Sequence, residues 1–312
     1  MICLGIDTSN YTTSVALADD QGTLHSERQL LPVKTGEVGL RQNEAVFLHN
    51  RQLPGLIEKL FINAPTRPDC VCASVAPRAD ENSYMPVFLV GAGTGRAIAA
   101  ALGVPFFETN HQAGHLRAAQ VDSGLEPGPY LALHLSGGTT DVLLCEDGRV
   151  TPLGTCLDLH AGQLVDRIGV LLGLPFPAGP AMEALAEGRI ITGIIPSTVS
   201  GASCHLSGAE TKLRQLSKEL SPGRIAAETY DVLCRTILKM LDNAARQTGV
   251  YQALMFGGVM SSQRLRRMCL ERVSKRRIPL RLYFGRPELS GDNAVGVALT
   301  GLERMVSHGS HS

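Results

Sequence analysis

The sequence lacks a net charge, a long apolar run and a secretory signal, and each absence excludes a class of protein. Its 29 basic and 29 acidic side chains balance, so a polyanion would have to be held by a local patch instead of the field of the whole protein. No stretch of about 18 apolar residues occurs, and we therefore expect no membrane association. The opening MICLGID enters a strand at once, without the basic and apolar regions of a signal. We expect a cytoplasmic protein.

Closely spaced cysteine pairs are also missing. The eight cysteines are spread from Cys3 to Cys269 with no C-x-x-C motif. In a reducing compartment such cysteines are mostly buried thiols, and we expect no disulfides.

What is present is a pattern of strands followed by helices. Three strand-like segments come first, and "QG" is the tight turn between the second and third. The segment 40–64 has helical spacing, and Pro54 should end or kink that helix. Alternating strands and helices then follow, at 69–77, 91–103, 104–110 and 111–121.

The order starts again after residue 129. Three strands are predicted within 129–158, helices over 161–174 and 223–249, and a loop-rich stretch between them at 173–209. A strand at 251–258, a basic helix, a strand at 280–287 and a last helix from Asn293 complete this half. The repeat predicts an α/β duplication around an interdomain cleft, with domains 1–122 and 123–312. The last helix is free to pack back on the first domain.

One hairpin occurs in both halves, as CLGIDTSNYTTSVALADDQG (3–22) and LALHLSGGTTDVLLCEDG (131–148). Each has a turn of small hydroxyl and glycine residues, whose N–H and hydroxyl groups suit a phosphate chain. A third glycine turn stands at 256–262. Nucleotide binding is one interpretation; the other is that such residues simply make good turns.

The chain resembles the tRNA threonylcarbamoyladenosine transferases, once labelled glycoproteases, within the actin, hexokinase and Hsp70 type of fold. The motifs that carry the resemblance are NHQAGH, LSGGTTDV, AGQLVDRIGVLLGLPFPAGP, LSGAETKL, GGVMSSQRLR and LSGDNAVGVA. The resemblance implies two actin-like, ribonuclease H-like domains. It also implies transfer of a threonylcarbamoyl group from its adenylate to N6 of an adenine in tRNA. ATP or an acyl adenylate would be the ligand, and the partners would be a small related pseudo-enzyme subunit and an ATPase subunit.

The two histidines in NHQAGH are the strongest candidates for a chemical role. On a helix, His111 and His115 lie on one face and could share a divalent ion, although this spacing alone also suits unrelated surface groups. Asp292, after Gly291, is a candidate third ligand, and the resemblance implies this triad. Two imidazoles and one carboxylate suit iron or zinc. A peptidase is disfavoured, because Gln112 stands where a zincin has its glutamate base.

The resemblance also assigns residues to the nucleotide and to catalysis. Asp166 can accept hydrogen bonds from both ribose hydroxyls, and Gly257 and Gly258 would let the adenine approach the backbone. The full set is His134, Leu135, Ser136, Gly137, Gly138, Asp166, Gly179, Gly257, Gly258 and Ser262 for nucleotide or substrate, with Asp7 and Ser9 for catalysis.

The chain departs from the family pattern at several positions. Asn10, Tyr11 and Thr12 occupy the place of an acidic pair, Thr139 replaces a histidine, Glu210 replaces a lysine, and Ser262 replaces an asparagine. These changes keep open two alternatives, a carbamoyltransferase acting on a small molecule and a non-catalytic nucleotide-binding scaffold. The basic run 264–281 could contact tRNA phosphates, or could be a solvated helix face.

Overall fold

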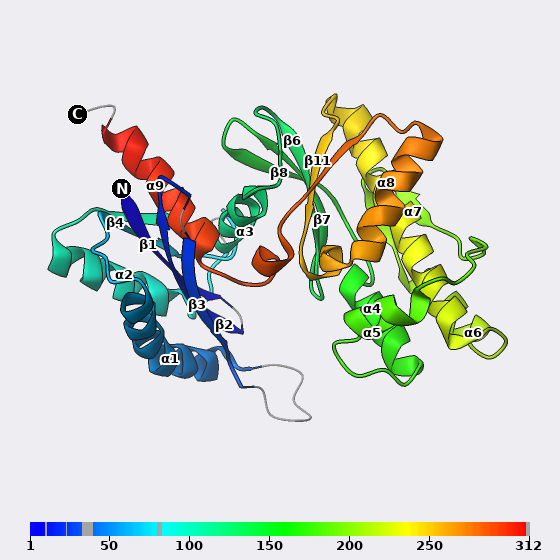
Figure 1. Cartoon of the computed structure of the whole chain (residues 1–312), viewed down its shortest axis with the longest axis horizontal. Coiled ribbons are helices and arrows are strands. Elements are labelled where there is room, and N and C mark those ends of the chain that lie inside the picture. The colour runs from blue at the N-terminus through cyan, green and yellow to red at the C-terminus, as the bar shows by residue number, and fades with distance from the viewer. Residues whose placement is uncertain (10, 23, 33–39, 80–82, 310–312) are drawn as a thin grey trace. The chain divides into compact units, whose positions relative to one another are not determined.

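The computed structural model describes residues 1–9, 11–22, 24–32, 40–79 and 83–309. The chain divides into two compact units (Figure 1). One unit is Met1–Ala119 with Gly291–Ser312, and the other is Gln120–Ser290.

The first unit is built on a five-stranded sheet in the order β3-β2-β1-β4-β5. Its strands are β1 (Ile2–Ser9), β2 (Thr12–Asp19), β3 (Leu24–Leu30), β4 (Cys70–Ser74) and β5 (Phe106–Thr109). The first three form an antiparallel meander, and β4 and β5 run parallel to β1. The predicted strands of this half are confirmed.

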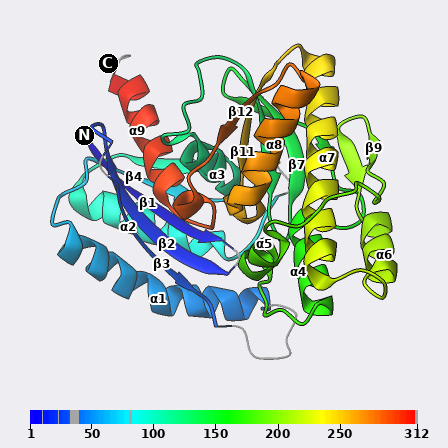
Figure 2. The same cartoon turned by 45° about the vertical axis from the view of Figure 1, so that its right-hand side comes forward.

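The two faces of this sheet are covered by different helices, because side chains along a strand alternate between faces. Leu4 and Ile6 belong to the core cluster that α1 (Gln42–Asn63) and α2 (Phe88–Leu102) bury. Cys3 and Gly5 point the other way, toward α9 (Val295–Gly309). Figure 2 shows α1 and α9 on opposite sides of β1, β2 and β3.

Helix α9 packs backbone to backbone on this sheet. A Cβ on Gly5 would lie 2.5 Å from the Ala298 nitrogen, and a Cβ on Gly301 would lie 2.3 Å from the Cys3 sulfur. Residues 291–312, which follow the second half in sequence, therefore belong to the first unit. Chain order places them in the domain 123–312, whereas the small residues of α9 pack on the sheet of the first unit.

Pro54 does not end helix α1, which corrects one of the two expected effects of this proline. The helix continues from Gln42 to Asn63 with Pro54 inside it, although proline removes the bond to the carbonyl four residues earlier. Leu53, Leu56 and Leu60 are all buried beneath this helix. Their burial stabilises the helix by about 1.5–3 kcal/mol each, which offsets the missing hydrogen bond.

The second unit has a sheet in the order β12-β11-β6-β7-β8. Its strands are β6 (Tyr130–Leu135), β7 (Thr140–Glu146), β8 (Arg149–Thr155), β11 (Gln252–Phe256) and β12 (Arg281–Phe284). Again three strands form an antiparallel meander and two run parallel to the first of them. The two sheets therefore share one topology, as a duplication requires.

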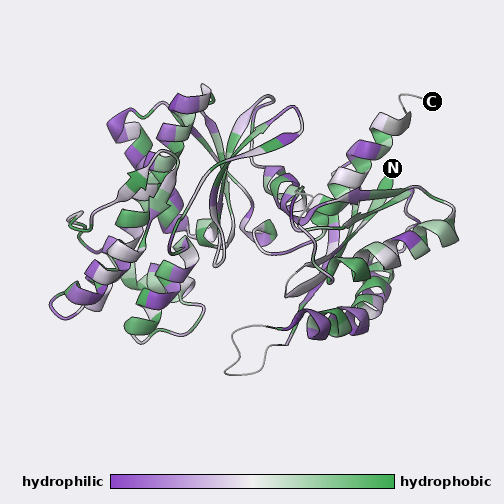
Figure 3. Ribbon diagram, turned by 180° about the vertical axis from the view of Figure 1, so that it is seen from behind, coloured by the Kyte–Doolittle hydropathy of each residue, from purple (hydrophilic) through white to green (hydrophobic). Residues whose placement is uncertain are grey.

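The helices of the second unit are α4 (Ala161–Leu171), α5 (Gly179–Ala186), α6 (Ser207–Leu216), α7 (Pro222–Thr248) and α8 (Gln263–Arg276). The predicted loop-rich stretch 173–209 contains α5, the start of α6 and a short hairpin of β9 (Thr198–Ser200) and β10 (Ser203–His205). Helices of both units are banded with hydrophobic and hydrophilic residues (Figure 3), as expected where one helix face is buried.

All eight cysteines are free thiols in buried positions, so their predicted burial is confirmed. Among the helices of the described residues, none has the length and apolar character needed to span a bilayer.

Candidate functional site

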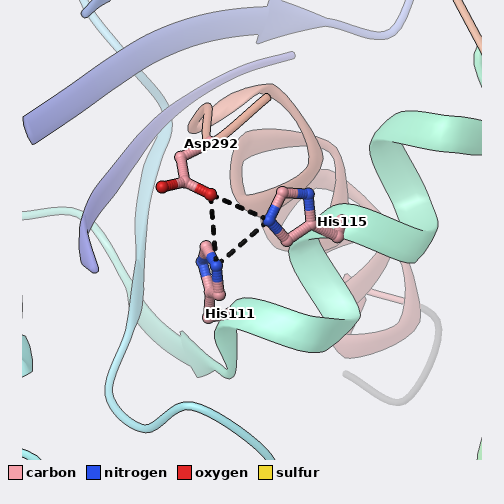
Figure 4. Close-up of side chains that lie close together, drawn as sticks. All are labelled: His111, His115 and Asp292. Carbon is pink, nitrogen blue, oxygen red and sulfur yellow. Dashed lines mark hydrogen bonds and ion pairs between the residues drawn. The ribbon is translucent and has the colours of Figure 1, made fainter. Parts of the chain in front are cut away.

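Three side chains of the first unit converge on one point (Figure 4). His111 and His115 come from α3 (His111–Gln120), and Asp292 comes from the turn before α9. The two Nε2 atoms are 3.0 Å apart, and Asp292 Oδ1 lies 3.2 Å from His115 Nε2 and 3.6 Å from His111 Nε2. In the described part of the chain this is the group of acidic, histidine or cysteine side chains that could hold a metal ion.

The spacing of these atoms suits a single cation. Ligand atoms about 2.1 Å from one ion lie about 3.0 Å apart at right angles and about 3.4 Å apart at the tetrahedral angle. The observed separations of 3.0–3.6 Å match one triangular face of such a coordination shell. Three protein ligands on one face leave the remaining positions open.

A backbone contact between two helices sets this geometry. A Cβ on Gly296 would lie only 1.8 Å from the Gly114 carbonyl oxygen, so α9 crosses α3 with almost no space between them. Gly114 precedes His115, and Gly296 follows Asp292 by about one helical turn. The absence of side chains at the crossing therefore brings the carboxylate to the imidazoles.

The electrostatics of the group favour the positive charge on His111 and the negative charge on Asp292. Burial by itself would lower the pKa of His111, but the charges of Asp7 and Asp292 and a hydrogen bond to Asp7 raise it. Burial would raise the pKa of Asp292, yet the two imidazoles and a hydrogen bond from Thr12 lower it to about 2. The carboxylate is therefore ionised at neutral pH and ready to hold a cation.

The first hairpin surrounds this centre. Asp7 Oδ2 lies 2.7 Å from His111 Nδ1, and the Ser9 hydroxyl donates to the same carboxylate oxygen at 3.1 Å. Thr12 donates to Asp292 Oδ2 at 3.2 Å. Asn10 lies outside the described residues, and Tyr11 is exposed.

Other hydroxyls of the first hairpin are bonded within the first unit. Thr8 donates to the Val87 carbonyl, and Thr13 lies within hydrogen-bond distance of His49 and Gln52. Their side chains are buried. These two hydroxyls of β1 and β2 therefore serve the core of the first unit, and the predicted phosphate contact of the turn between the strands stays a prediction.

The second unit contains a cavity of about 380 Å³, within the range of about 300–1,000 Å³ that small-molecule sites occupy. Five residues predicted for the nucleotide line it, namely Gly137, Asp166, Gly179, Gly258 and Ser262. They come from the turn after β6, from α4 and α5, and from the short helix after β11 together with the N-cap of α8.

A backbone hydrogen bond fixes the Asp166 side chain in this cavity. Its Oδ1 accepts a hydrogen bond from the Ala178 N–H at 2.7 Å, which holds the side chain in place. Tyr230 also lines the cavity; it is buried, and its hydroxyl donates to the Gly179 carbonyl at 3.1 Å. Ser262 accepts from the Leu265 N–H as the cap of α8, so its hydroxyl already has a structural partner.

The other predicted nucleotide residues lie beside the cavity and do not line it. His134 and Leu135 are in β6, where His134 stacks on Phe256 at a centroid distance of 4.8 Å. Gly257, at φ +99°, is close to the strand, since a Cβ there would lie 2.3 Å from the Leu135 carbonyl oxygen. Gly257 therefore lies against β6, and its predicted contact with the adenine stays a prediction.

The Ser136 and Gly138 positions shape the turn itself. Ser136 N donates to the Thr139 carbonyl at 2.8 Å, and Gly138 N lies 3.3 Å from the Ser136 hydroxyl. Gly162 at the start of α4 packs against this turn, where a Cβ would lie 2.6 Å from the Ser136 carbonyl oxygen. The turn is therefore held against a helix N-terminus.

Comparison with known proteins adds an independent finding. Residues 35–299 match the family described as tRNA N6-adenosine threonylcarbamoyltransferase. A protein of that name from Methanopyrus kandleri is 31% identical over 310 residues, which cover 97% of this chain and 87% of that protein. The chain belongs to the tRNA N6-adenosine threonylcarbamoyltransferase family.

Solved structures place the threonylcarbamoyltransferase family member in its fold class. HypF from T. kodakarensis superposes with a TM-score of 0.62 at 16% identity, over 99% of this chain and 48% of HypF, about half of that protein's length. A ROK hexokinase from Thermus thermophilus gives a TM-score of 0.52 at 17% identity, over 98% of this chain and all of that one. The predicted α/β fold of the actin, hexokinase and Hsp70 type is confirmed.

One residue at which this threonylcarbamoyltransferase family member departs from the family pattern forms ion pairs within the second unit. Glu210, predicted to stand in the place of a lysine, is buried on α6 and accepts from Arg214 Nε at 2.9 Å. Arg167 on α4 approaches its other oxygen at 3.3 Å. The reversed charge at position 210 is thus neutralised within the second unit.

The basic run lies on and after α8, where several of its charges are used internally. Arg264 is buried and pairs with Glu187 at 3.4 Å, while Arg272 pairs with the buried Asp231 at 2.7 Å. Arg266 donates to two backbone carbonyls. This face therefore presents fewer free cations than the sequence suggests.

Sequence reasoning missed several residues of these sites. Ser74, at the end of β4, donates to Asp7, and its place at the carboxyl end of a strand parallel to β1 could have indicated this. Glu183 lines the cavity one helical turn after Gly179, and Tyr230 lines it from α7. The helical spacing from Gly179 could have indicated Glu183, whereas no local sequence pattern indicates Tyr230.

Proposed function

We propose that this family member transfers a threonylcarbamoyl group from its adenylate to N6 of an adenine in tRNA. The convergence of His111, His115 and Asp292 carries the proposal. In the reaction the adenine N6 nitrogen forms a bond to the carbamoyl carbon and loses one proton to solvent. The bond from that carbon to the phosphate oxygen breaks, and AMP leaves with the electron pair of that bond.

The triad is proposed to hold one divalent iron or zinc ion. Neutral imidazole nitrogen and a carboxylate oxygen suit both metals, and the observed ligand separations fit one ion. When bound, the metal would supply Lewis-acid anchoring and polarisation of the carbamoyl group. Thr12 keeps one carboxylate oxygen of Asp292 engaged, so that the other faces the histidines.

The cavity of the second unit is proposed to hold the adenylate. Asp166 would accept hydrogen bonds from the ribose hydroxyls, since its position is fixed by Ala178. Gly137 and Gly258 leave room for backbone contact, because a Cβ at either position would meet no atom within 4 Å. ATP would occupy the same place.

The acceptor and partners follow from family membership. We infer that the chain acts in the cytoplasm on tRNA, with a small related pseudo-enzyme subunit and an ATPase subunit. Arg276 and Arg277, beyond the paired arginines of α8, are candidates for phosphate contact.

The test is a transfer assay. Purified chain with its partner subunits, Fe²⁺ or Zn²⁺, threonylcarbamoyl adenylate and an unmodified tRNA transcript should yield the modified nucleoside in digested tRNA, read by mass spectrometry. His111→Ala removes a ligand and should lower the yield by about 100-fold, since loss of a group that only orients a ligand already costs about 10- to 100-fold. Asp166→Ala should raise the KM for the adenylate. Glu219→Ala, at an exposed site on the second unit, is the control.

The outcomes separate the alternatives. Transfer to a small amine but not to tRNA would favour a small-molecule carbamoyltransferase, and nucleotide binding without turnover would favour a scaffold. If His111→Ala kept full activity with any metal, the proposed role of the triad would be wrong.

A further inference from the structure

Asp7 occupies an unusual position beside the candidate metal centre. Its side chain is 1% exposed at the end of β1, yet it is a carboxylate. An unpaired buried carboxylate would cost several kcal/mol, roughly, so the groups around it must hold its charge. Three do so, namely the hydroxyl of Ser9, the hydroxyl of Ser74 and Nδ1 of His111.

The strand register explains how these groups meet. Ile6 of β1 is opposite Ala73 of β4 in the parallel ladder, so Asp7 and Ser74 follow as neighbours at the carboxyl ends of both strands. Asp7 shares a sheet face with Cys3 and Gly5, because alternate residues point the same way. That is the face on which α9 packs, and α9 in turn contacts α3, which carries His111.

The hydrogen bond between Asp7 and His111 determines which imidazole nitrogen carries the proton. An ionised carboxylate only accepts hydrogen bonds, so the 2.7 Å contact between His111 Nδ1 and Asp7 Oδ2 requires the proton on Nδ1. A neutral imidazole with its proton on Nδ1 has its lone pair on Nε2. This Nε2 is the atom that faces His115 Nε2 at 3.0 Å and Asp292 Oδ1 at 3.6 Å.

We propose that Asp7 is a positioning residue, which holds His111 in the tautomer and orientation that present Nε2 to a divalent cation. The inference rests on the proposed function for the cation itself. It revises the prediction that Asp7 and Ser9 are catalytic, since both side chains are buried and both oxygens of Asp7 accept hydrogen bonds from within the unit. Ser9 in turn orients Asp7.

A purely structural role would have different consequences. If Asp7 only tied β1 to β4 through Ser74, its loss would lower stability and leave the imidazole unchanged. A positioning role predicts a change at His111 itself. The experiment therefore measures the imidazole and its metal affinity in addition to the melting temperature.

The first measurement uses metal-free protein. Nitrogen-15 NMR of the histidine side chains at alkaline pH, where the imidazoles are neutral, should show the His111 proton on Nδ1 in the unmodified chain. His111→Ala assigns the signal. In Asp7→Asn the other tautomer should become populated, because the amide no longer offers a charge and can present its N–H₂ group. A proton on Nε2 in the unmodified chain would overturn the proposal.

The second measurement uses Co²⁺ alone as the probe. Asp7→Asn should weaken Co²⁺ binding about 10- to 100-fold, the range for loss of a group that orients a ligand, and should alter the visible absorption of bound Co²⁺. Asp147→Asn, the same substitution at an exposed turn of the second unit, is the control and should stay within about threefold of the unmodified chain. Asp7→Asn binding within that same threefold, with a shifted melting temperature alone, would show a structural role.

The two proposals fail in different ways. If the unmodified chain bound no Co²⁺, Fe²⁺ or Zn²⁺, the proposed function of the triad would be wrong, while the NMR measurement would still decide the tautomer. If His111→Ala abolished Co²⁺ binding and Asp7→Asn did not weaken it, the metal site would stand and the role of Asp7 would fall. Should Asp7→Asn not fold, the proton position in the unmodified chain decides the question.

Discussion

Asp158 is a residue whose role is visible only in the folded chain. It lies before the hairpin of β9 and β10 in sequence, yet it accepts hydrogen bonds from the N–H groups of Leu206 and Ser207 at the start of α6. Burial by itself would raise its pKa, but these bonds and the Ser207 hydroxyl lower it to about 2. It therefore serves as a remote cap for α6.

Replacing Asp158 by Ala should lower the free energy of unfolding by about 1–2 kcal/mol at neutral pH, the usual loss for a helix cap. Because the folded-state pKa is depressed, this contribution is present above the ordinary value of 3.8 and is lost as the pH falls toward about 2. Urea unfolding of both proteins at pH 7 and at pH 3 checks this, and the difference should shrink at the lower pH.

Glu219→Ala is the matched control for that measurement, since Glu219 is an exposed carboxylate just after the same helix. It should change stability by less than about 0.5 kcal/mol at either pH. A constant gap between the Asp158 variant and the unmodified chain across pH would argue against the capping role.

At the residue scale the sequence predicted part of the site. The spacing of His111 and His115 indicates one helix face, and the structure places them there with their nitrogens 3.0 Å apart. The position of Asp292 after Gly291 makes it a candidate ligand, but only the family resemblance joins it to the two histidines, because no local pattern links residues so far apart in the chain. Asp7 was assigned to catalysis, since nothing in β1 alone reveals that its carboxylate is buried against an imidazole.

At the scale of elements, the crossing of α3 and α9 decides whether the triad forms. Gly296 sits in the contact, where a Cβ would lie 1.8 Å from the Gly114 carbonyl oxygen and 2.7 Å from the Ala118 nitrogen. Backbone atoms cannot rotate away as a side chain can. Any side chain at position 296 must therefore push the two helices apart.

Gly296→Ala should lower the free energy of unfolding by roughly 1–3 kcal/mol or more, as overpacking does. It should also weaken Co²⁺ binding, because the shift of α9 carries Asp292 away from His115. Thermal unfolding and metal titration of the purified variant measure the two effects. Unchanged metal affinity would mean that the triad does not depend on this crossing.

Gly93→Ala is the same substitution on an exposed face of α2, where a Cβ would meet nothing within 4 Å. It should stabilise the chain by up to about 1 kcal/mol, since alanine is the better helix former. The pair of variants thus separates the crowding at position 296 from the general effect of replacing glycine.

Element prediction failed where packing overrides local preference. Pro54 predicted an end or a kink, and the end is wrong, because α1 runs on to Asn63 with buried leucines on both sides of the proline. The stretch 173–209 reads as loop, yet it holds α5, whose Met182 and Ala186 are buried in the second core. Short elements depend on such contacts more than on their own sequence.

At the scale of the whole molecule, the two units differ in the number of chain segments that build them. The second unit, Gln120–Ser290, is one continuous segment with its own core. The first unit needs two segments, because Gly291–Ser312 follow the second unit and α9 covers one face of its sheet.

Residues 120–290 expressed alone should therefore fold and bind an adenine nucleotide, whereas residues 1–119 alone should not unfold cooperatively. Joining 291–312 to 1–119 by a flexible linker should restore a cooperative transition, since α9 again covers Cys3 and Gly5. Circular dichroism melts and nucleotide calorimetry test these three chains. A cooperative melt of 1–119 alone would show that α9 is dispensable for the first fold.

The sequence by itself determined the repeat of strands and helices, the paired hairpins and the two histidines on one helix face. These features are local, because period and turn chemistry act over a few residues. Only the tertiary structure decided that α9 packs on the first sheet, that the first hairpin contacts Asp292 and His111, and that Tyr230 lines the cavity of the second unit. Those contacts join residues far apart in the chain, and they depend on where small residues let two backbones touch.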